Sequence, residues 1–223
     1  MQRRNRLSRS LQARNRGFTL IEILVVITII AALAGLVVAL VPQLIGQSEE
    51  TQSMNNLKNI GGILIAKKAA GKMKKWSGAA FLLQVKDQVK DEDLKLFISP
   101  SDDRFPDRPK IGSEEFIAMY RKLKDLKAGV EDRHCSYAGP NWAKFPEVKA
   151  GSEALKSRLW GSDRCYQGLP FHKGGVVVLY DSTKVEILEL KEIKGADLEA
   201  GIVQIGPNSP DERLKKMCYF AGE

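Results

Sequence analysis

The sequence predicts an α+β protein in which one long amino-terminal helix packs on a small antiparallel sheet. An uncharged aliphatic run at residues 23–41 is followed by a pattern with helical period, which predicts the long helix. Further on, an apolar run at residues 175–180 and a nearly alternating run at 184–190 flank a polar turn and predict a β-hairpin. We therefore expect a leader at residues 1–17, a helix at 18–75 and a globular α+β head at 76–223.

The leader is strongly basic. It contains six arginines and no acidic residue, so it carries most of the formal net charge of +8. The remainder of the chain is close to neutral, which makes a nucleic-acid partner improbable on charge grounds. A cluster of arginines before an apolar run places that end in the cytoplasm, and the first charges after the run, Glu49 and Glu50, suit the opposite side.

The apolar run is long enough to cross a membrane. Nineteen residues in a helix extend over about 28 Å, close to the thickness of the hydrocarbon core of a bilayer. With the residues just before it, the span covers approximately residues 20–41. The sequence therefore predicts a single transmembrane segment.

Glu22 is the anomaly in this region, because it lies at the start of the span. A charged side chain in hydrocarbon is costly and usually has a partner and a role. Thr19 and Glu22 have the spacing of a capping box, so one interpretation is that Glu22 only caps the helix. A cap does not explain the arginine leader or the Gly-Phe junction before it.

Residues 17–22, Gly-Phe-Thr-Leu-Ile-Glu, resemble the processing site of type IV prepilins and of the pseudopilins of type II secretion systems. The resemblance implies that a prepilin peptidase cleaves between Gly17 and Phe18 and methylates the new amine of Phe18. It implies that Glu22, beside Thr19, pairs with the terminal amine of a neighbouring subunit during assembly. It also implies a type IV pilin-like fold, a single-pass inner-membrane anchor with a periplasmic head, and a structural role in a pilus or pseudopilus.

Other functions stay open. A secretory signal peptide would be cut after Ala34, at the Ala-Leu-Ala sequence of residues 32–34. The head could instead be a membrane-anchored periplasmic binding module, or a minor tip pilin outside the filament body. For an anchored hydrolase, His172, Asp181 and a serine are available as base, orienting group and nucleophile, but no catalytic motif supports an enzyme. We expect no cofactor and no small-molecule substrate.

The second part of the long helix is predicted to be amphipathic. Met54, Leu57, Ile60 and Leu64 recur at spacings of three and four, which gives one apolar face. We expect a bend near Pro42, an end near Lys72, and close packing or a bend at Gly61-Gly62. A lysine run between residues 67 and 75 is interpreted as a solvated helix end.

In the head, residues 79–89, 113–126 and 151–159 are predicted to contain short helices. Residues 99–110 are predicted to form a loop, because they combine three prolines with several aspartates. Asp102, Asp103 and Asp107 are interpreted as solvated rather than as calcium ligands, since the EF-hand spacing is absent.

The hairpin carries a weaker resemblance. His172 before it and Asp181 after the first strand resemble a His…Asp-Gly element of prepilin-like proteins from planctomycete-type bacteria, with Ser182 in place of the Gly. Residues 99–102 and 136–139 resemble two further landmarks of that group. Subgroup membership is the expectation that follows.

The chain has three cysteines, Cys135, Cys165 and Cys218. A head outside the cytoplasm permits one disulfide, and we prefer Cys165–Cys218 because it would tie the carboxyl-terminal tail to the head. The cysteines and the two histidines, His134 and His172, lack the spacing of a zinc site, so no metal is expected.

Overall fold

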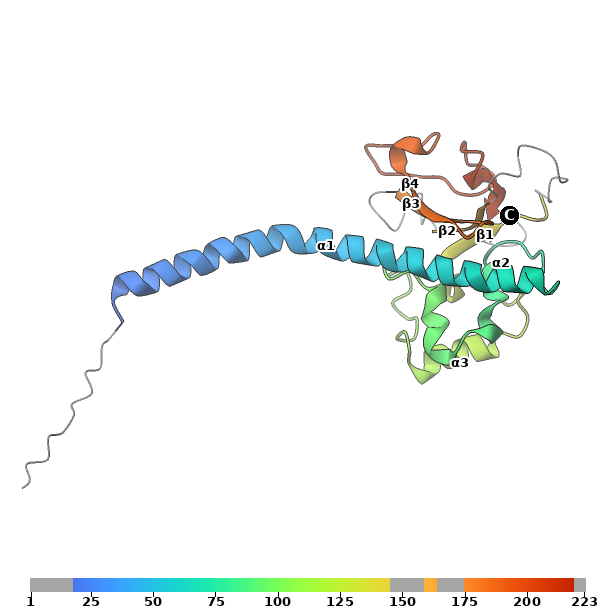
Figure 1. The fold of residues 1–223 in the computed structure, drawn as a ribbon, viewed down its shortest axis with the longest axis horizontal. Helices are drawn as coiled ribbons and strands as arrows, with labels where there is room; N and C mark the ends of the chain where they lie inside the picture. Colours follow the sequence, from blue (N-terminus) through green and yellow to red (C-terminus); the bar gives the residue numbers. More distant parts are fainter. Residues whose placement is uncertain (1–17, 145–158, 164–174, 219–223) are drawn as a thin grey trace, which may run out of the picture. The chain divides into compact units, whose positions relative to one another are not determined.

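A computed structural model describes residues 18–144, 159–163 and 175–218 (Figure 1). The chain divides into two compact units, residues 1–44 and residues 45–223, which are described separately. Helix α1 (Leu20–Ala69) contributes its first part to one unit and its second part to the other. The predicted α+β class, with a long amino-terminal helix and a small antiparallel sheet, is confirmed.

In the first unit, α1 is apolar and exposed. The stretch Leu20–Val38 is long and apolar enough to cross a membrane, and none of it is buried. The helix continues through Pro42 without interruption, so the missing N–H of this proline does not end it.

The helix ends at Ala69, before the predicted end near Lys72. The amide of Gly71 donates to the Lys68 carbonyl, and that of Lys72 donates to the Lys67 carbonyl. Gly71 has a φ of 67°, so these bonds form a Schellman motif, which ends helices where glycine supplies the left-handed conformation. Residues 70–75, predicted as helix, therefore lie beyond its end.

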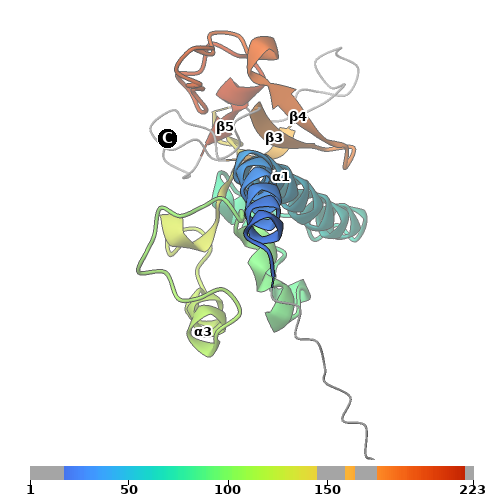
Figure 2. The same ribbon diagram turned by 90° about the vertical axis from the view of Figure 1, so that its left-hand side faces the viewer.

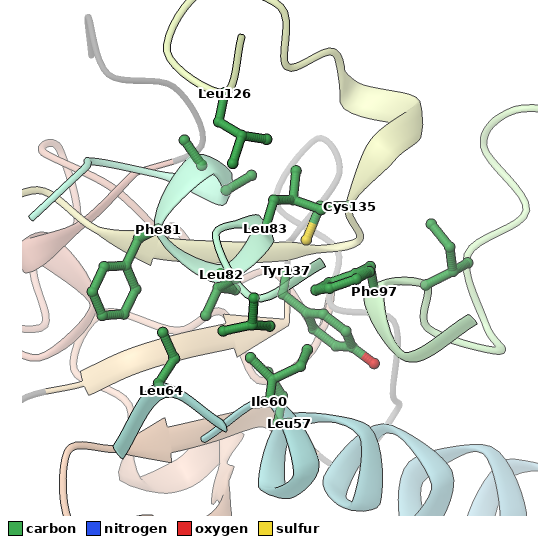
Figure 3. Packing of buried hydrophobic residues seen from close by; sticks show 14 of the residues in the cluster. Leu57, Ile60, Leu64, Phe81, Leu82, Leu83, Phe97, Leu126, Cys135 and Tyr137 are labelled. Carbon is green, nitrogen blue, oxygen red and sulfur yellow. The ribbon is translucent and has the colours of Figure 1, made fainter. Parts of the chain in front are cut away.

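In the second unit, α1 buries the predicted face. Leu57, Ile60 and Leu64 are fully buried and contact a cluster that includes Phe81 and Tyr137 (Figure 3). The same face also buries Ser53 and Asn56, two polar residues that the apolar pattern did not indicate. The predicted amphipathic helix is confirmed, with a polar section at its amino-terminal end.

The sheet has five strands in the order β4-β3-β2-β1-β5, and every pairing is antiparallel. The predicted hairpin is confirmed as β3 and β4. The other strands were not predicted. The strands are β1 (Tyr137–Pro140), β2 (Leu159–Asp163), β3 (Gly175–Tyr180), β4 (Val185–Glu189) and β5 (Met217–Cys218).

Strand β3 is apolar throughout because both of its faces are covered. Val177 and Leu179 belong to the cluster that contains the buried face of α1. Val176 and Val178 belong to a second cluster, which also contains buried residues from the segment that follows the hairpin. The sheet thus lies between the second part of α1 and the carboxyl-terminal segment, and Figure 2 shows α3 on the opposite side of this second part of the helix.

The helical segments of the head are short. Residues 79–89 form only α2 (Ala79–Leu83) and a 3-10 turn, while residues 113–126 contain α3 (Glu114–Lys122), whose N-cap Ser113 accepts a hydrogen bond from the Phe116 amide. Most of the predicted helix at 151–159 lies outside the described residues, and Leu159 begins β2. The 3-10 turns are η1 (Lys86–Gln88), η2 (Asp91–Phe97), η3 (Asp132–His134), η5 (Leu190–Glu192) and η6 (Leu214–Lys216).

Gln84 follows the end of α2, within the predicted helix at 79–89. Its side-chain amide donates to the Phe81 and Lys74 carbonyls, and its carbonyl oxygen accepts from the Lys74 amide. Its own backbone carbonyl accepts from Lys67 Nζ at 2.5 Å. Gln84 therefore joins α2 to the segment after α1, and Lys67 is half-buried rather than solvated as predicted; its burial lowers its pKa.

Candidate processing and assembly site

The amino-terminal end of α1 has a capping box. The Thr19 amide donates to Glu22 Oε2 at 2.7 Å and the Thr19 hydroxyl donates to the same oxygen at 2.9 Å. In return, the Glu22 amide lies 3.3 Å from Thr19 Oγ1. These bonds complete the hydrogen bonding of the Thr19 amide and add to the bond that the Glu22 amide donates to the Thr19 carbonyl.

The cap leaves Glu22 able to bind a second group. Both bonds from Thr19 reach Oε2, so Oε1 can accept from another donor. Phe18, directly before the cap, is 80% exposed. A carboxylate with an accessible oxygen at the start of an apolar helix is suited to bind a cation within lipid, where an unpaired charge is costly.

The comparison with protein families gives one match. The prokaryotic N-terminal methylation motif matches residues 12–38, which include the end of the leader, the capping box and the first part of α1. The chain has a type IV prepilin-like amino terminus. No curated protein and no solved structure matches the chain.

The prepilin-like motif agrees with the exposed apolar helix. Together they support a single-pass membrane anchor at the amino-terminal end of the chain. Gly17 lies outside the described residues, and the individual roles of Gly17, Phe18, Thr19 and Glu22 stay predictions. Membership of the planctomycete-type group also stays a prediction, since His172 is outside the described residues.

A second constellation of charged groups lies in the head, around Asp102. Arg104 donates to both carboxylate oxygens of Asp102 at 2.6 Å, and Arg108 Nη2 donates to Oδ2 at 3.0 Å. The Ser136 hydroxyl donates to Oδ2 at 2.5 Å. The guanidinium carbons of both arginines lie 5.1 Å from the centroid of the Phe105 ring. We call Asp102, Arg104, Arg108 and Ser136 the Asp102 cluster.

The prediction that Asp102 is solvated is wrong. Its side chain is fully buried, and those of Arg104 and Arg108 are 6% exposed. Burial alone would raise the pKa of Asp102, but the hydrogen bonds and charges of Arg104, Ser136 and Arg108 outweigh it and hold the pKa at about 2. Both oxygens of this carboxylate accept hydrogen bonds from guanidinium groups, so the carboxylate is occupied by arginine and not arranged to bind calcium.

The loop that contains Asp102 is also tied to the second part of α1. Ser99 Oγ lies 2.9 Å from Ser53 Oγ, and Ser101 Oγ donates to Glu49 at 2.8 Å. The Asn56 side chain donates to the Ile98 carbonyl at 3.2 Å. These contacts explain the polar residues on the buried face of the helix. Ser53 and Asn56, which lie three residues apart on the apolar face, were the feature of the sequence that could have indicated a contact between α1 and this loop.

The cysteines and histidines form no described metal site. Cys218 is buried, with Sγ 3.8 Å from the Pro140 carbonyl, while Cys165 and His172 lie outside the described residues. The proposed Cys165–Cys218 disulfide therefore stays a prediction. His134 Nδ1 accepts from the Glu131 amide. Within the described ranges, no three His, Cys, Asp or Glu side chains come together as metal ligands.

A hollow of about 320 Å³ opens between η1, η2 and α3. Its rim carries the ion pairs Lys86–Asp87 and Arg121–Asp91, and within each pair the positive and negative charges cancel. Tyr120 also lines it. None of the residues predicted for processing or assembly lines the hollow.

Proposed function

We propose that the protein is a structural subunit, processed after Gly17 and assembled through its amino-terminal helix into a pilus or pseudopilus. The observation that carries the proposal is the methylation motif at residues 12–38, at the start of an exposed apolar helix. In this proposal the leader stays in the cytoplasm and the head lies in the periplasm. The partners are a prepilin peptidase, the inner membrane and further copies or related pilins, and the subunit has no catalytic role.

The proposed mechanism is electrostatic registration between subunits. Cleavage creates an ammonium group on Phe18, and Glu22 of one copy binds the ammonium group of the next. Both charges are in apolar surroundings, where a charge without a partner is strongly disfavoured. The register in which each Glu22 meets an amine is therefore favoured over displaced registers.

The test separates the charge of Glu22 from its role as a cap. Glutamine is as suitable as glutamate at the third position of a capping box, so Glu22→Gln keeps the cap and removes the charge. Thr19→Ala does the reverse: it removes the capping hydroxyl, at a cost of about 0.5–2 kcal/mol, and keeps the carboxylate. We expect Glu22→Gln to be cleaved normally and to assemble poorly, and Thr19→Ala to assemble.

Crosslinking in cells measures assembly. A filament subunit gives a ladder of oligomers, which Glu22→Gln should reduce and Thr19→Ala should retain. Normal ladders from Glu22→Gln would contradict the charge mechanism. If the wild-type protein is cleaved and methylated but gives no ladder, the protein is an anchored binding module or a minor tip pilin.

A further inference from the structure

We propose that His134 is an acid-released latch in the head: its neutral imidazole holds residues 131–136 in place, and its protonation frees this segment. We call residues 131–136 the strap. The inference concerns the second unit alone and does not depend on assembly into a filament.

The latch consists of two reciprocal hydrogen bonds at η3. The Glu131 amide donates to His134 Nδ1 at 2.8 Å, and the His134 amide donates to the Glu131 side chain. An imidazole nitrogen that accepts a hydrogen bond carries no proton, so the docked strap requires the neutral ring with its proton on Nε2. An imidazolium ring is a donor at both nitrogens and cannot replace this bond in either orientation.

The surroundings of His134 do not favour a positive charge. The residue is 6% exposed, and Tyr120 of α3 packs edge-on against its ring with the centroids 6.2 Å apart. Burial lowers the pKa of His134. The charge of Glu131 and its backbone hydrogen bond oppose this effect, and the repulsion of Arg133 adds to it.

Several other titratable and charged groups lie near the latch. Burial raises the pKa of Tyr120 well above its usual value, so this phenol stays neutral. Arg133 pairs with Glu131 at 3.0 Å and lies 3.7 Å from Asp107. The Asp102 carboxylate, with its pKa at about 2, stays ionised. Beyond these, Cys135 follows His134 in the chain, and the Arg108 charge acts on Tyr120.

The strap joins three parts of the head. The Tyr120 hydroxyl donates to the His134 carbonyl at 2.7 Å, which attaches the strap to α3. The Ser136 amide donates to the Phe97 carbonyl at 2.9 Å, and the Ser136 hydroxyl donates to Asp102. Release of the strap would therefore loosen α3, the end of η2 and the Asp102 cluster together.

The direction of the pH effect follows from proton binding. The imidazole of a released strap takes up a proton near its usual value of 6.5, while the docked strap resists protonation. Above this pH, the neutral imidazole contributes its whole stabilisation to the docked strap. Docking weakens as the pH falls, because the released form binds more protons than the docked form.

The experiment follows amide hydrogen exchange in the full-length protein in detergent micelles at pH 7.5 and pH 5, after correction for intrinsic exchange rates. We expect exchange at residues 131–136 to rise about tenfold or more at pH 5, the effect of losing one buried hydrogen bond. Amides of α1 at residues 57–64 should keep their protection and serve as the internal reference.

Two variants complete the test, since the chain has only two histidines. His134→Gln offers an acceptor that does not titrate, so the acid response should disappear. His172→Gln should retain it, and the single imidazole left in that variant lets NMR follow His134 directly. An unchanged strap at pH 5 in the wild type, or an acid response that survives His134→Gln, would overturn the proposal. If His134→Gln does not fold, a His134 titration at or above pH 6.5 in His172→Gln would overturn it equally.

Discussion

At the scale of single residues, Asp102 organises a proline-rich loop that the sequence indicated to be solvated. Its carboxylate binds two buried arginines and Ser136. Removing one partner of a buried ion pair leaves uncompensated charge, at a cost of about 3–5 kcal/mol. We therefore expect Asp102→Asn to lower the free energy of unfolding by this amount, measured by urea unfolding with tryptophan fluorescence.

Asp103 provides the matched control, because it is the exposed neighbour of Asp102. Asp103→Asn should change stability by less than about 0.5 kcal/mol. The Asp102 pKa is lowered from 3.8 to about 2, so its contribution is complete above pH 4 and is lost as the pH falls through 2. Equal effects of the two substitutions would show that the cluster does not stabilise the head.

Gly61 and Gly62 form a second pair with opposite expectations. A Cβ on Gly62 meets nothing within 4 Å, whereas a Cβ on Gly61 would lie 2.8 Å from Leu179 Cδ1. Gly62→Ala should stabilise the helix by up to about 1 kcal/mol. In Gly61→Ala, the added methyl group would overpack against the buried Leu179 side chain. This overpacking costs about 1–3 kcal/mol, which cancels or exceeds the gain in helix propensity.

Thermal unfolding of the two glycine variants measures this difference. The unfolding temperature of Gly62→Ala should be higher than that of the wild type, and the unfolding temperature of Gly61→Ala should be equal to or lower than that of the wild type. Equal stabilisation by both substitutions would show that the helix does not approach β3 as closely as the structure places it.

At the scale of elements, the second part of α1 is held by its buried face. Leu57 is fully buried and Lys58, its neighbour, is exposed. Leu57→Ala should cost about 2–5 kcal/mol through lost burial and a residual cavity. Lys58→Ala should be nearly neutral by the same urea measurement. A small cost for Leu57→Ala would mean that helix propensity, rather than packing on the sheet, maintains this part of α1.

The elements that the sequence predicted are those with a local signal. The hairpin of β3 and β4 and the apolar face of α1 each repeat a clear period. Strands β1 and β2 were missed because they are short and include glycine or proline, so only pairing with their neighbours defines them. Gly71, whose left-handed conformation ends α1, could have indicated this helix end, but the prediction did not use it.

The Asp102 cluster could not be predicted from local sequence. Asp102 and Ser136 lie 34 residues apart, and their contact depends on the strap, the loop and α1 being folded together. The methylation motif is the opposite case. It occupies one continuous stretch of the chain, residues 12–38, so it is readable in the sequence itself.

At the scale of the whole molecule, the two units have different surfaces. Apart from Glu22 and Thr28, the described side chains of α1 in the first unit are apolar, and all of them are exposed, whereas the second unit buries apolar residues in two clusters. An apolar surface of this size in the first unit requires lipid or other helices to cover it. This is the property expected of a membrane anchor.

The intact mass of the membrane form tests the central claim most directly. The account predicts a polypeptide that begins at Phe18 and carries one additional methyl group, in the membrane fraction. A chain that retains residues 1–17, or a soluble chain that begins after Ala34, would contradict it.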